Sequence, residues 1–150
     1  MKKDDILQDF LSKDARRIWS ASGEVLNSVI TNRDDIEALF PHLSEIRNAT
    51  SGIDYGGAFL SNKRYLDKAL EVIKESKGSG CLCEYAFTDY GQSVESLKNV
   101  GFILLSKKTE NFITTGEVEC SRCHQRYIAE EEFTGWHMTS SRHRKVATCL

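Results

Sequence analysis

The stretch GEVECSRCHQRY, residues 116–127, contains two cysteines, Cys120 and Cys123, with two residues between them. The segments on either side, 111–120 and 125–133, are rich in β-branched and aromatic residues and predict β-strands. A C-x-x-C pair at a tight turn between strands is typical of a zinc knuckle, which directs two thiolates at one metal ion. A tetrahedral zinc ion has four ligands, so this pair needs partners elsewhere in the chain.

The expected partners are Cys81 and Cys83 in the segment CLCEYAF. This segment predicts a strand, in which residues two apart project from the same face. The spacer 84–119 is longer than the roughly 15–20 residues that commonly separate the two halves of a zinc ribbon, but it fits if it forms the sheet itself. The sequence therefore predicts a structural Zn²⁺ ion held by Cys81, Cys83, Cys120 and Cys123.

Two other kinds of cysteine site stay open at this point. A mixed ligand set could combine Cys120 and Cys123 with downstream histidines such as His137 and His143, and His124 follows the knuckle directly. A C-x-x-C pair also serves thiol redox chemistry, but there it lies at a helix N-terminus after a strand. The strand-like flanks favour the metal site.

Cys149, near the end of the chain, is expected to be an ordinary thiol. The chain has no visible signal peptide, because its first residues are charged, and no apolar run that could cross a membrane. Thiols in a reducing cytoplasm favour metal binding over disulfides, so we expect a cytoplasmic protein.

The first half of the chain predicts short amphipathic helices, because apolar residues recur there at intervals of three and four. Pro41 divides one of these runs into two short helices or one kinked helix, and the glycine-rich segment 51–59 predicts a loop. Beyond residue 78 the pattern predicts three or four antiparallel strands, with one or two helical turns at 94–101. The predicted helical runs lie in segments 4–12, 14–30, 32–46 and 61–78.

These patterns together predict an α+β fold. A bundle of short helices, which could be HEAT-like hairpins, forms subdomain 1–78, and a small antiparallel sheet with a zinc-ribbon-like four-cysteine site forms subdomain 79–150. The chain has 150 residues, enough for two such subdomains to share one compact unit.

Composition limits the classes of partner. The formal net charge of −2 disfavours nucleic acid as the main partner, because duplex binding normally rests on a basic surface. The alternative is a zinc-ribbon nucleic-acid or regulatory module with a small basic and aromatic patch. That patch would consist of Arg122, Arg126, Trp136, His137 and the basic tail 142–145.

Recognisable catalytic motifs are missing from the sequence. The run 130–132 has three glutamates, but consecutive residues on a strand point to alternating faces, so they do not form a paired-carboxylate site. The glycine-containing stretches lack the frame of a phosphate loop, and no G-x-S-x-G or H-E-x-x-H occurs. We therefore expect a protein that is not an enzyme, with no small-molecule substrate and no membrane partner.

The stretches DARRIWSASGEVLNS (14–28), LFPHLSEIRNATSGIDYGGAFLSNKRYLDKALEVI (39–73) and GCLCEY (80–85) resemble bacterial immunity proteins of the contact-dependent growth inhibition type. In that group a helical front half is followed by a sheet with paired cysteines. The resemblance implies tight binding of a cognate toxin, expected to be a nuclease, by covering its active site. Acidic side chains would suit a basic nuclease surface. The candidate contacts are Asp34, Asp35, Glu37, Glu130, Glu131 and Glu132.

Overall fold

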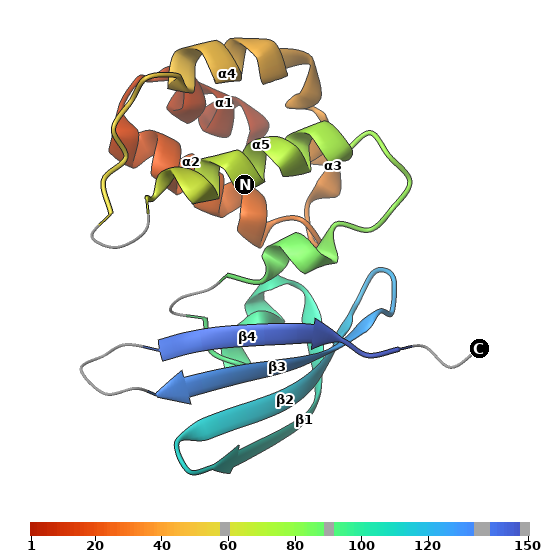
Figure 1. The fold of residues 1–150 in the computed structure, drawn as a ribbon. Helices are drawn as coiled ribbons and strands as arrows, with labels where there is room; N and C mark the ends of the chain where they lie inside the picture. The colour runs from red at the N-terminus through yellow and green to blue at the C-terminus, as the bar shows by residue number, and fades with distance from the viewer. Residues whose placement is uncertain (58–60, 89–91, 134–138, 148–150) are drawn as a thin grey trace. The chain divides into compact units, whose positions relative to one another are not determined.

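The structure, a computed structural model, describes residues 1–57, 61–88, 92–133 and 139–147 (Figure 1). The chain divides into two compact units, Met1–Tyr85 and Ala86–Leu150. The first unit is helical and the second contains an antiparallel sheet, which confirms the predicted α+β class. The division falls inside a short 3-10 helix, η2 (Cys83–Ala86), whereas the sequence pattern places it after residue 78.

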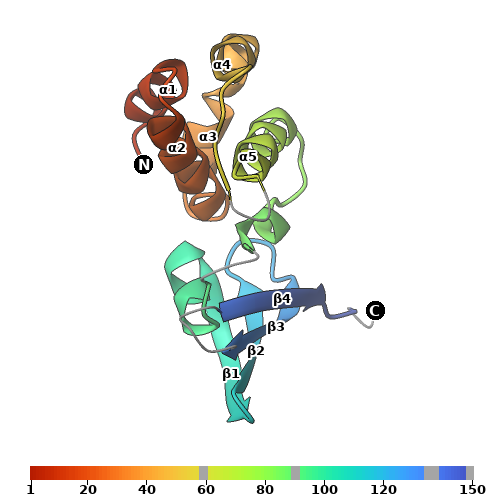
Figure 2. The ribbon, with the colours of Figure 1, turned by 60° about the vertical axis from the view of Figure 1, so that its left-hand side comes forward.

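The helices of the first unit pack on one another through the apolar stripes that the sequence predicts. Ile18, Ala21, Val25 and Leu26, all on one face of α2, are at most 1 % exposed. The helix pairs that pack most extensively are α2 with α5, and α1 with α2 and α4, and α5 also contacts α3 and α4 (Figure 2). The helices in the described part of this unit are α1 (Lys3–Leu11), α2 (Ala15–Asn27), α3 (Arg33–Glu37), the 3-10 helix η1 (Phe40–His42), α4 (Leu43–Thr50) and α5 (Lys63–Glu75).

Local sequence signals explain several helix ends. Asp14 caps α2, because its Oδ1 accepts a hydrogen bond of 2.9 Å from the backbone N–H of Arg17. Pro41 lies in the first turn of η1, where its missing N–H costs little, and α4 follows directly. Of the two predicted alternatives, two short helices or one kinked helix, the structure has the first: α3 ends before Pro41, and η1 leads into α4.

The second unit is a four-stranded antiparallel sheet in the order β1-β2-β3-β4. A 3-10 helix, η3 (Glu95–Val100), precedes the first strand and confirms the helical turns predicted at 94–101. The strands are β1 (Phe102–Glu110), β2 (Ile113–Cys120), β3 (Arg126–Phe133) and β4 (Thr139–Lys145).

One face of this sheet, which we call the inner face, packs against the segment that precedes β1 (Figure 2). The ring of Phe87 lies 4.9 Å from the rings of Phe102 and Tyr127, centroid to centroid, and all three residues are at most 4 % exposed. Burying each such ring contributes about 1.5–3 kcal/mol. On β2, a Cβ on Gly116 would overlap the Val94 side chain, so only glycine allows this close approach.

The strand predicted at CLCEYAF is wrong, because residues 83–86 form η2. The N–H of Tyr85 donates to the carbonyl of Leu82 at 3.0 Å, which closes a helical turn. The buried residues of the segment also follow helical spacing and do not alternate as in a strand. They are Leu82, Cys83, Ala86 and Phe87.

The strand β4 was not among the predicted strands, because its residues 142–145 look like a basic tail in the sequence. In the structure β4 pairs with β3, so that Arg142 lies opposite Glu130 and His143 lies opposite Ala129. The charges of β4 suit an edge strand, where they oppose pairing with other chains.

Candidate metal centre

The turn between β2 and β3 holds the first cysteine pair in a tight, internally bonded loop. Cys120 ends β2 and is fully buried, and its N–H donates to the carbonyl of Gln125 at 2.9 Å. Its carbonyl accepts from the N–H of His124 at 2.9 Å. The N–H of Arg122 donates to Cys120 Sγ at 3.4 Å, a bond that stabilises a thiolate. This is the knuckle that the C-x-x-C spacing predicts, with Cys123 exposed at its end.

The second cysteine pair lies on the segment that leads into η2. Cys83 is the first residue of η2 and is 3 % exposed, while Cys81 is half-buried. Leu82 between them is buried, which fixes the backbone of the segment. The two cysteines therefore reach the site from a turn and not from one face of a strand.

The Sγ atoms of Cys81, Cys83, Cys120 and Cys123 all lie within 4.8 Å of one another. No disulfide joins any of the four. Four thiolates at about 2.3 Å from a tetrahedral zinc ion are about 3.8 Å apart, so the observed spacing needs only a small contraction. Four cysteines with this arrangement form a possible metal site, and four-sulfur sites in proteins typically bind zinc or iron.

Charged side chains surround the knuckle on the other face of the sheet, which we call the outer face. Glu119 pairs with His124 Nδ1 at 3.1 Å and with Arg126 Nε at 3.1 Å. The hydrogen bonds from His124 and then from Arg126 hold the pKa of the Glu119 carboxyl below its ordinary value. Arg126 also lies 3.4 Å from Glu117, so its charge is largely engaged inside the sheet unit.

The histidines weighed as alternative ligands lie elsewhere, or outside the described residues. His143 stacks on Phe87 with ring centroids 4.2 Å apart, and His124 pairs with Glu119. Among the described residues, the group of possible metal ligands consists of the four cysteines, and neither histidine belongs to it. His137, Trp136 and Cys149 lie outside the described residues.

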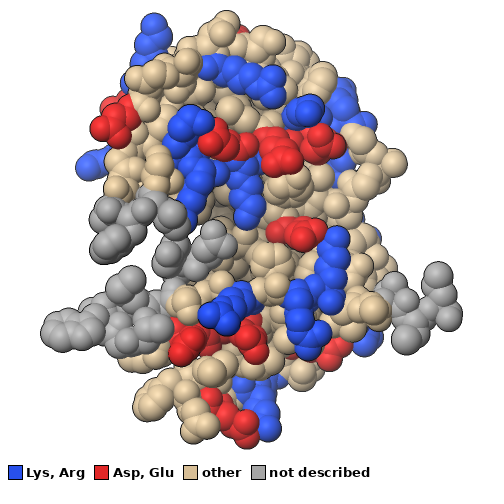
Figure 3. Space-filling view, viewed as in Figure 1, with Lys and Arg blue, Asp and Glu red and all other residues tan. Residues whose placement is uncertain are grey.

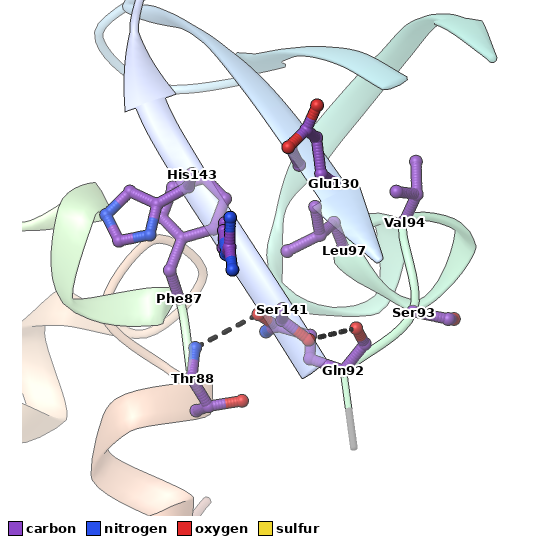
Figure 4. A pocket seen from close by; sticks show the side chains of 11 residues that line it. Phe87, Thr88, Gln92, Ser93, Val94, Leu97, Glu130, Ser141 and His143 are labelled. Carbon is purple, nitrogen blue, oxygen red and sulfur yellow. Dashed lines mark hydrogen bonds between the residues drawn. The ribbon is translucent and has the colours of Figure 1, made fainter. Parts of the chain in front are cut away.

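A small cavity lies between the segment before β1 and the inner face of the sheet (Figure 4). Its volume is about 10 Å³, room for about one water molecule. Its polar groups bond to one another: Gln92 Oε1 accepts from the N–H of Thr88 at 3.0 Å, and Ser141 Oγ donates to the Gln92 carbonyl at 2.8 Å. The cavity is therefore a packing feature and not a substrate pocket.

The acidic residues predicted as partner contacts differ in how far the fold uses them. In the helical unit, Asp35 accepts from Asn32 Nδ2 at 2.8 Å and Glu37 accepts from Lys77 Nζ at 3.0 Å, while Asp34 is exposed.

In the sheet unit, Glu131 faces inward and its Oε2 accepts from the N–H of Val94 at 3.3 Å. Glu130 and Glu132 are exposed on the outer face. Only part of each predicted acidic run is thus available to a partner.

Sequence reasoning missed two residues that the structure makes conspicuous. Arg33 is buried, at 7 % exposure, although an arginine in a short polar helix looks like a surface residue. Phe112 is 77 % exposed and has a φ of 65°. The signal for Phe112 was the two-residue spacing, Asn111 and Phe112, between two strand-like segments, which predicts a tight hairpin turn.

Positive and negative side chains are interspersed over the face drawn in Figure 3. Among the residues that the structure describes, no helix has the length and apolar character needed to cross a membrane. Comparisons with models of protein families, with curated proteins and with solved structures gave no match.

Proposed function

We propose that Cys81, Cys83, Cys120 and Cys123 bind one structural Zn²⁺ ion. The support is the gathering of four thiols within 4.8 Å, with the two most buried at 3 % and 0 % exposure. A site with four protein ligands has no open position for water or substrate, so it stabilises the fold and performs no reaction. The redox alternative has less support, because Cys120 ends a strand and does not begin a helix.

We further propose that the protein is a cytoplasmic immunity protein without enzymatic activity, which binds and neutralises a cognate bacterial toxin. The observation that carries this proposal is an exposed apolar cluster at one end of the sheet, which we call the apolar tip. Phe112, Ile113 and Phe133 form it, with 77 %, 38 % and 54 % of their surfaces exposed. The N–H of Phe133 donates to the carbonyl of Phe112 at 3.0 Å, so the three residues lie at the same end of the sheet. Ile113 pairs with Glu132 on the outer face, and Phe133 follows Glu132 on the opposite face.

Phe112 has a backbone conformation that is unfavourable for a bulky residue, so the stability of the fold does not explain why a phenylalanine lies at this position. Asn111 and Phe112 form the two-residue turn between the paired residues Glu110 and Ile113, with φ values of 49° and 65°. Glycine is favoured at the second position of such a turn, and a bulky residue there costs about 1 kcal/mol or more. Against the residues that the structure describes, Phe112 buries less than a quarter of its surface, so little burial offsets this cost. Exposed aromatic side chains of this kind commonly anchor protein–protein interfaces.

The charge beside the apolar tip favours a basic partner. The two segments that form it, 110–113 and 130–133, contain four glutamates and no lysine or arginine, although Glu110 pairs with Lys108 at 2.9 Å and Arg142 lies opposite Glu130. Nuclease surfaces that bind the phosphates of nucleic acid are basic, and such complementarity speeds association and sharpens specificity. We propose the contacts at the tip together with Glu130 and Glu132, which are exposed in the same unit. In the helical unit Asp34 is also exposed, but Asp35 and Glu37 are hydrogen-bonded to Asn32 and Lys77.

The alternative, a zinc-ribbon nucleic-acid module, has weaker support. Arg126 of its predicted patch is paired with Glu117 and Glu119. Arg142 lies directly opposite Glu130 on the neighbouring strand. Binding of RNA or DNA that falls steeply with rising salt would favour this alternative over the toxin.

The test uses the purified product of the neighbouring gene as the partner, with Phe112→Gly as the variant. The wild-type protein should form a one-to-one complex and protect cells that express the toxin. Phe112→Gly should weaken the complex by about 30-fold or more, as for an interface hot spot. Ile103→Ser is the matched control, because Ile103 is 47 % exposed on the same strand pair but lies opposite Glu119, at the other end of the sheet.

Two outcomes would contradict different parts of the proposal. If the wild-type protein neither binds the neighbouring product nor protects cells, the toxin is not its partner. If the complex forms and Phe112→Gly binds as tightly as the wild type, the apolar tip is not the contact surface.

A further inference from the structure

Arg33, the first residue of α3, has a buried guanidinium that holds one short segment of backbone. Its Nη1 donates to the carbonyl of Gly80 at 2.6 Å. Its Nη2 donates to the carbonyls of Ser76 at 3.0 Å and of Gly78 at 2.8 Å. All three acceptors lie within five consecutive residues, so the planar fork clamps segment 76–80 from one side.

Segment 76–80 needs such a clamp, because its own sequence does little to fix its path. It begins at Ser76, the C-cap of α5, where the last helical carbonyls have no partner within the helix. Two of its five residues are glycines, which are the most conformationally permissive residues. The positive guanidinium also suits the negative end of the α5 dipole.

The segment ends immediately before Cys81. The position of the Gly80 carbonyl fixes the peptide group that joins Gly80 to Cys81, and Cys83 follows at the start of η2. Arg33 therefore controls where the chain enters the first half of the candidate metal centre. A buried charge is costly unless it is hydrogen-bonded, so the guanidinium depends on the three carbonyls and holds them in place in turn.

We propose that Arg33 is a positioning residue for the metal centre. It does not touch the ion; it holds segment 76–80 so that Cys81 and Cys83 are placed for binding before the metal arrives. Outer contacts that orient metal ligands typically raise metal affinity 10–100-fold. This inference rests on the proposed zinc site.

The experiment measures Zn²⁺ affinity of the full-length protein by competition with a chromophoric chelator. Arg33→Lys keeps the positive charge but loses the planar guanidinium with its two donor groups, and Arg33→Met loses both the charge and the donors. Both variants should bind Zn²⁺ about 10–100-fold more weakly than the wild type, with Arg33→Met the weaker of the two. Helical content, measured by far-ultraviolet circular dichroism, should stay close to that of the wild type.

The matched control is Ser76→Ala. Ser76 Oγ donates to the carbonyl of Ile73 at 2.6 Å, so this change weakens the same end of α5 but leaves the three acceptors of Arg33 in place. Its Zn²⁺ affinity should equal that of the wild type. If Ser76→Ala and the Arg33 variants lose affinity equally, Arg33 is merely structural and the inference fails.

A second variant covers the case in which the Arg33 variants do not fold. Insertion of one glycine after Gly80 keeps every bond of Arg33 but shifts Cys81 along the chain, and it should lower Zn²⁺ affinity without changing the stability of the helices. Full Zn²⁺ affinity in the insertion variant, or in a folded Arg33→Lys variant, would overturn the inference. A wild-type protein that binds no Zn²⁺ would instead reject the zinc site on which the inference rests.

Discussion

The carboxylate of Glu131 accepts a hydrogen bond of 3.3 Å from the backbone N–H of Val94, the N-cap residue of η3, and so joins β3 to the start of η3. An acidic side chain at the start of a helical segment satisfies an N–H that has no partner within the segment. The middle residue of the run 130–132 therefore serves the fold, while its two neighbours project from the outer face.

We expect Glu131→Gln to lower the free energy of unfolding by about 1 kcal/mol, because an amide accepts a weaker hydrogen bond than a carboxylate. Glu130→Gln and Glu132→Gln should leave stability within about 0.5 kcal/mol of the wild type, as is usual for exposed sites. Urea denaturation followed by circular dichroism checks all three. Equal effects of the three substitutions would contradict the inward placement of Glu131.

We expect Gly116→Ala to destabilise the sheet unit. The added Cβ would overlap Val94 Cγ1 and lie 3.2 Å from the carbonyl oxygen of Ser106, so η3 or β1 has to shift. Overpacking of this kind costs about 1–3 kcal/mol. Gly23→Ala is the matched control: nothing lies within 4 Å of its Cβ in the middle of α2, so it should stabilise by about 0.5–1 kcal/mol. Opposite shifts in the denaturation midpoint would confirm both predictions.

Glu95 gives the sheet unit a dependence on pH. Hydrogen bonds from Lys98 and then from Lys107 hold the pKa of the Glu95 carboxyl below its ordinary value. The folded protein thus binds a proton at Glu95 less readily than the unfolded chain does. The stability that ionised Glu95 contributes is therefore fully present above the unfolded pKa of about 4.3, and it is lost as the pH falls through the lower pKa of the folded state. The ion pairs of Glu95 with Lys98 and Lys107 are exposed, so salt should weaken both.

Glu95→Gln should therefore flatten the loss of stability on acidification and reduce its sensitivity to salt near neutral pH. Thermal unfolding between pH 3 and pH 7, at low and high salt, provides the measurement. An unchanged pH profile in the variant would show that Glu95 does not carry this effect.

The sequence predicted the parts of the fold that depend on regular burial. The helix stripe that includes Ile18 and Val25 and the strands β1 to β3 follow from apolar spacing, since one side of each element must face a core. The four-cysteine set was also predictable, because spacing and ligand number limit the choices.

The parts that it missed depend on contacts without a periodic signal. Two cysteines at a spacing of two imitate strand alternation, although Leu82 and Phe87 around them are buried at helical spacing. The edge strand β4 has polar residues on both faces, so it lacks an apolar pattern. Arg33 binds carbonyls more than forty residues away along the chain, a contact that only the fold brings about.

The metal centre gives the most direct test of the four-cysteine assignment. We expect the purified protein to contain about one zinc ion per chain, as a closed Cys₄ site requires. Cys83→Ser should abolish stoichiometric binding, because the buried thiol is a ligand and a hydroxyl is a poor substitute. Cys149→Ser is the control, since the sequence predicts an ordinary thiol at Cys149, and it should retain full zinc content.

Removal of the ion should destabilise the fold around the knuckle more than the helices. Four thiolates without their cation repel one another and are costly to bury, so the thiols would take up protons as the metal leaves. A strong chelator should therefore lower the unfolding temperature of the wild type and of Cys149→Ser, and leave that of Cys83→Ser unchanged. Metal content by mass spectrometry and thermal unfolding with and without chelator check this. Undiminished zinc in Cys83→Ser would reject the four-cysteine site, and iron in place of zinc would keep the ligands but change the metal.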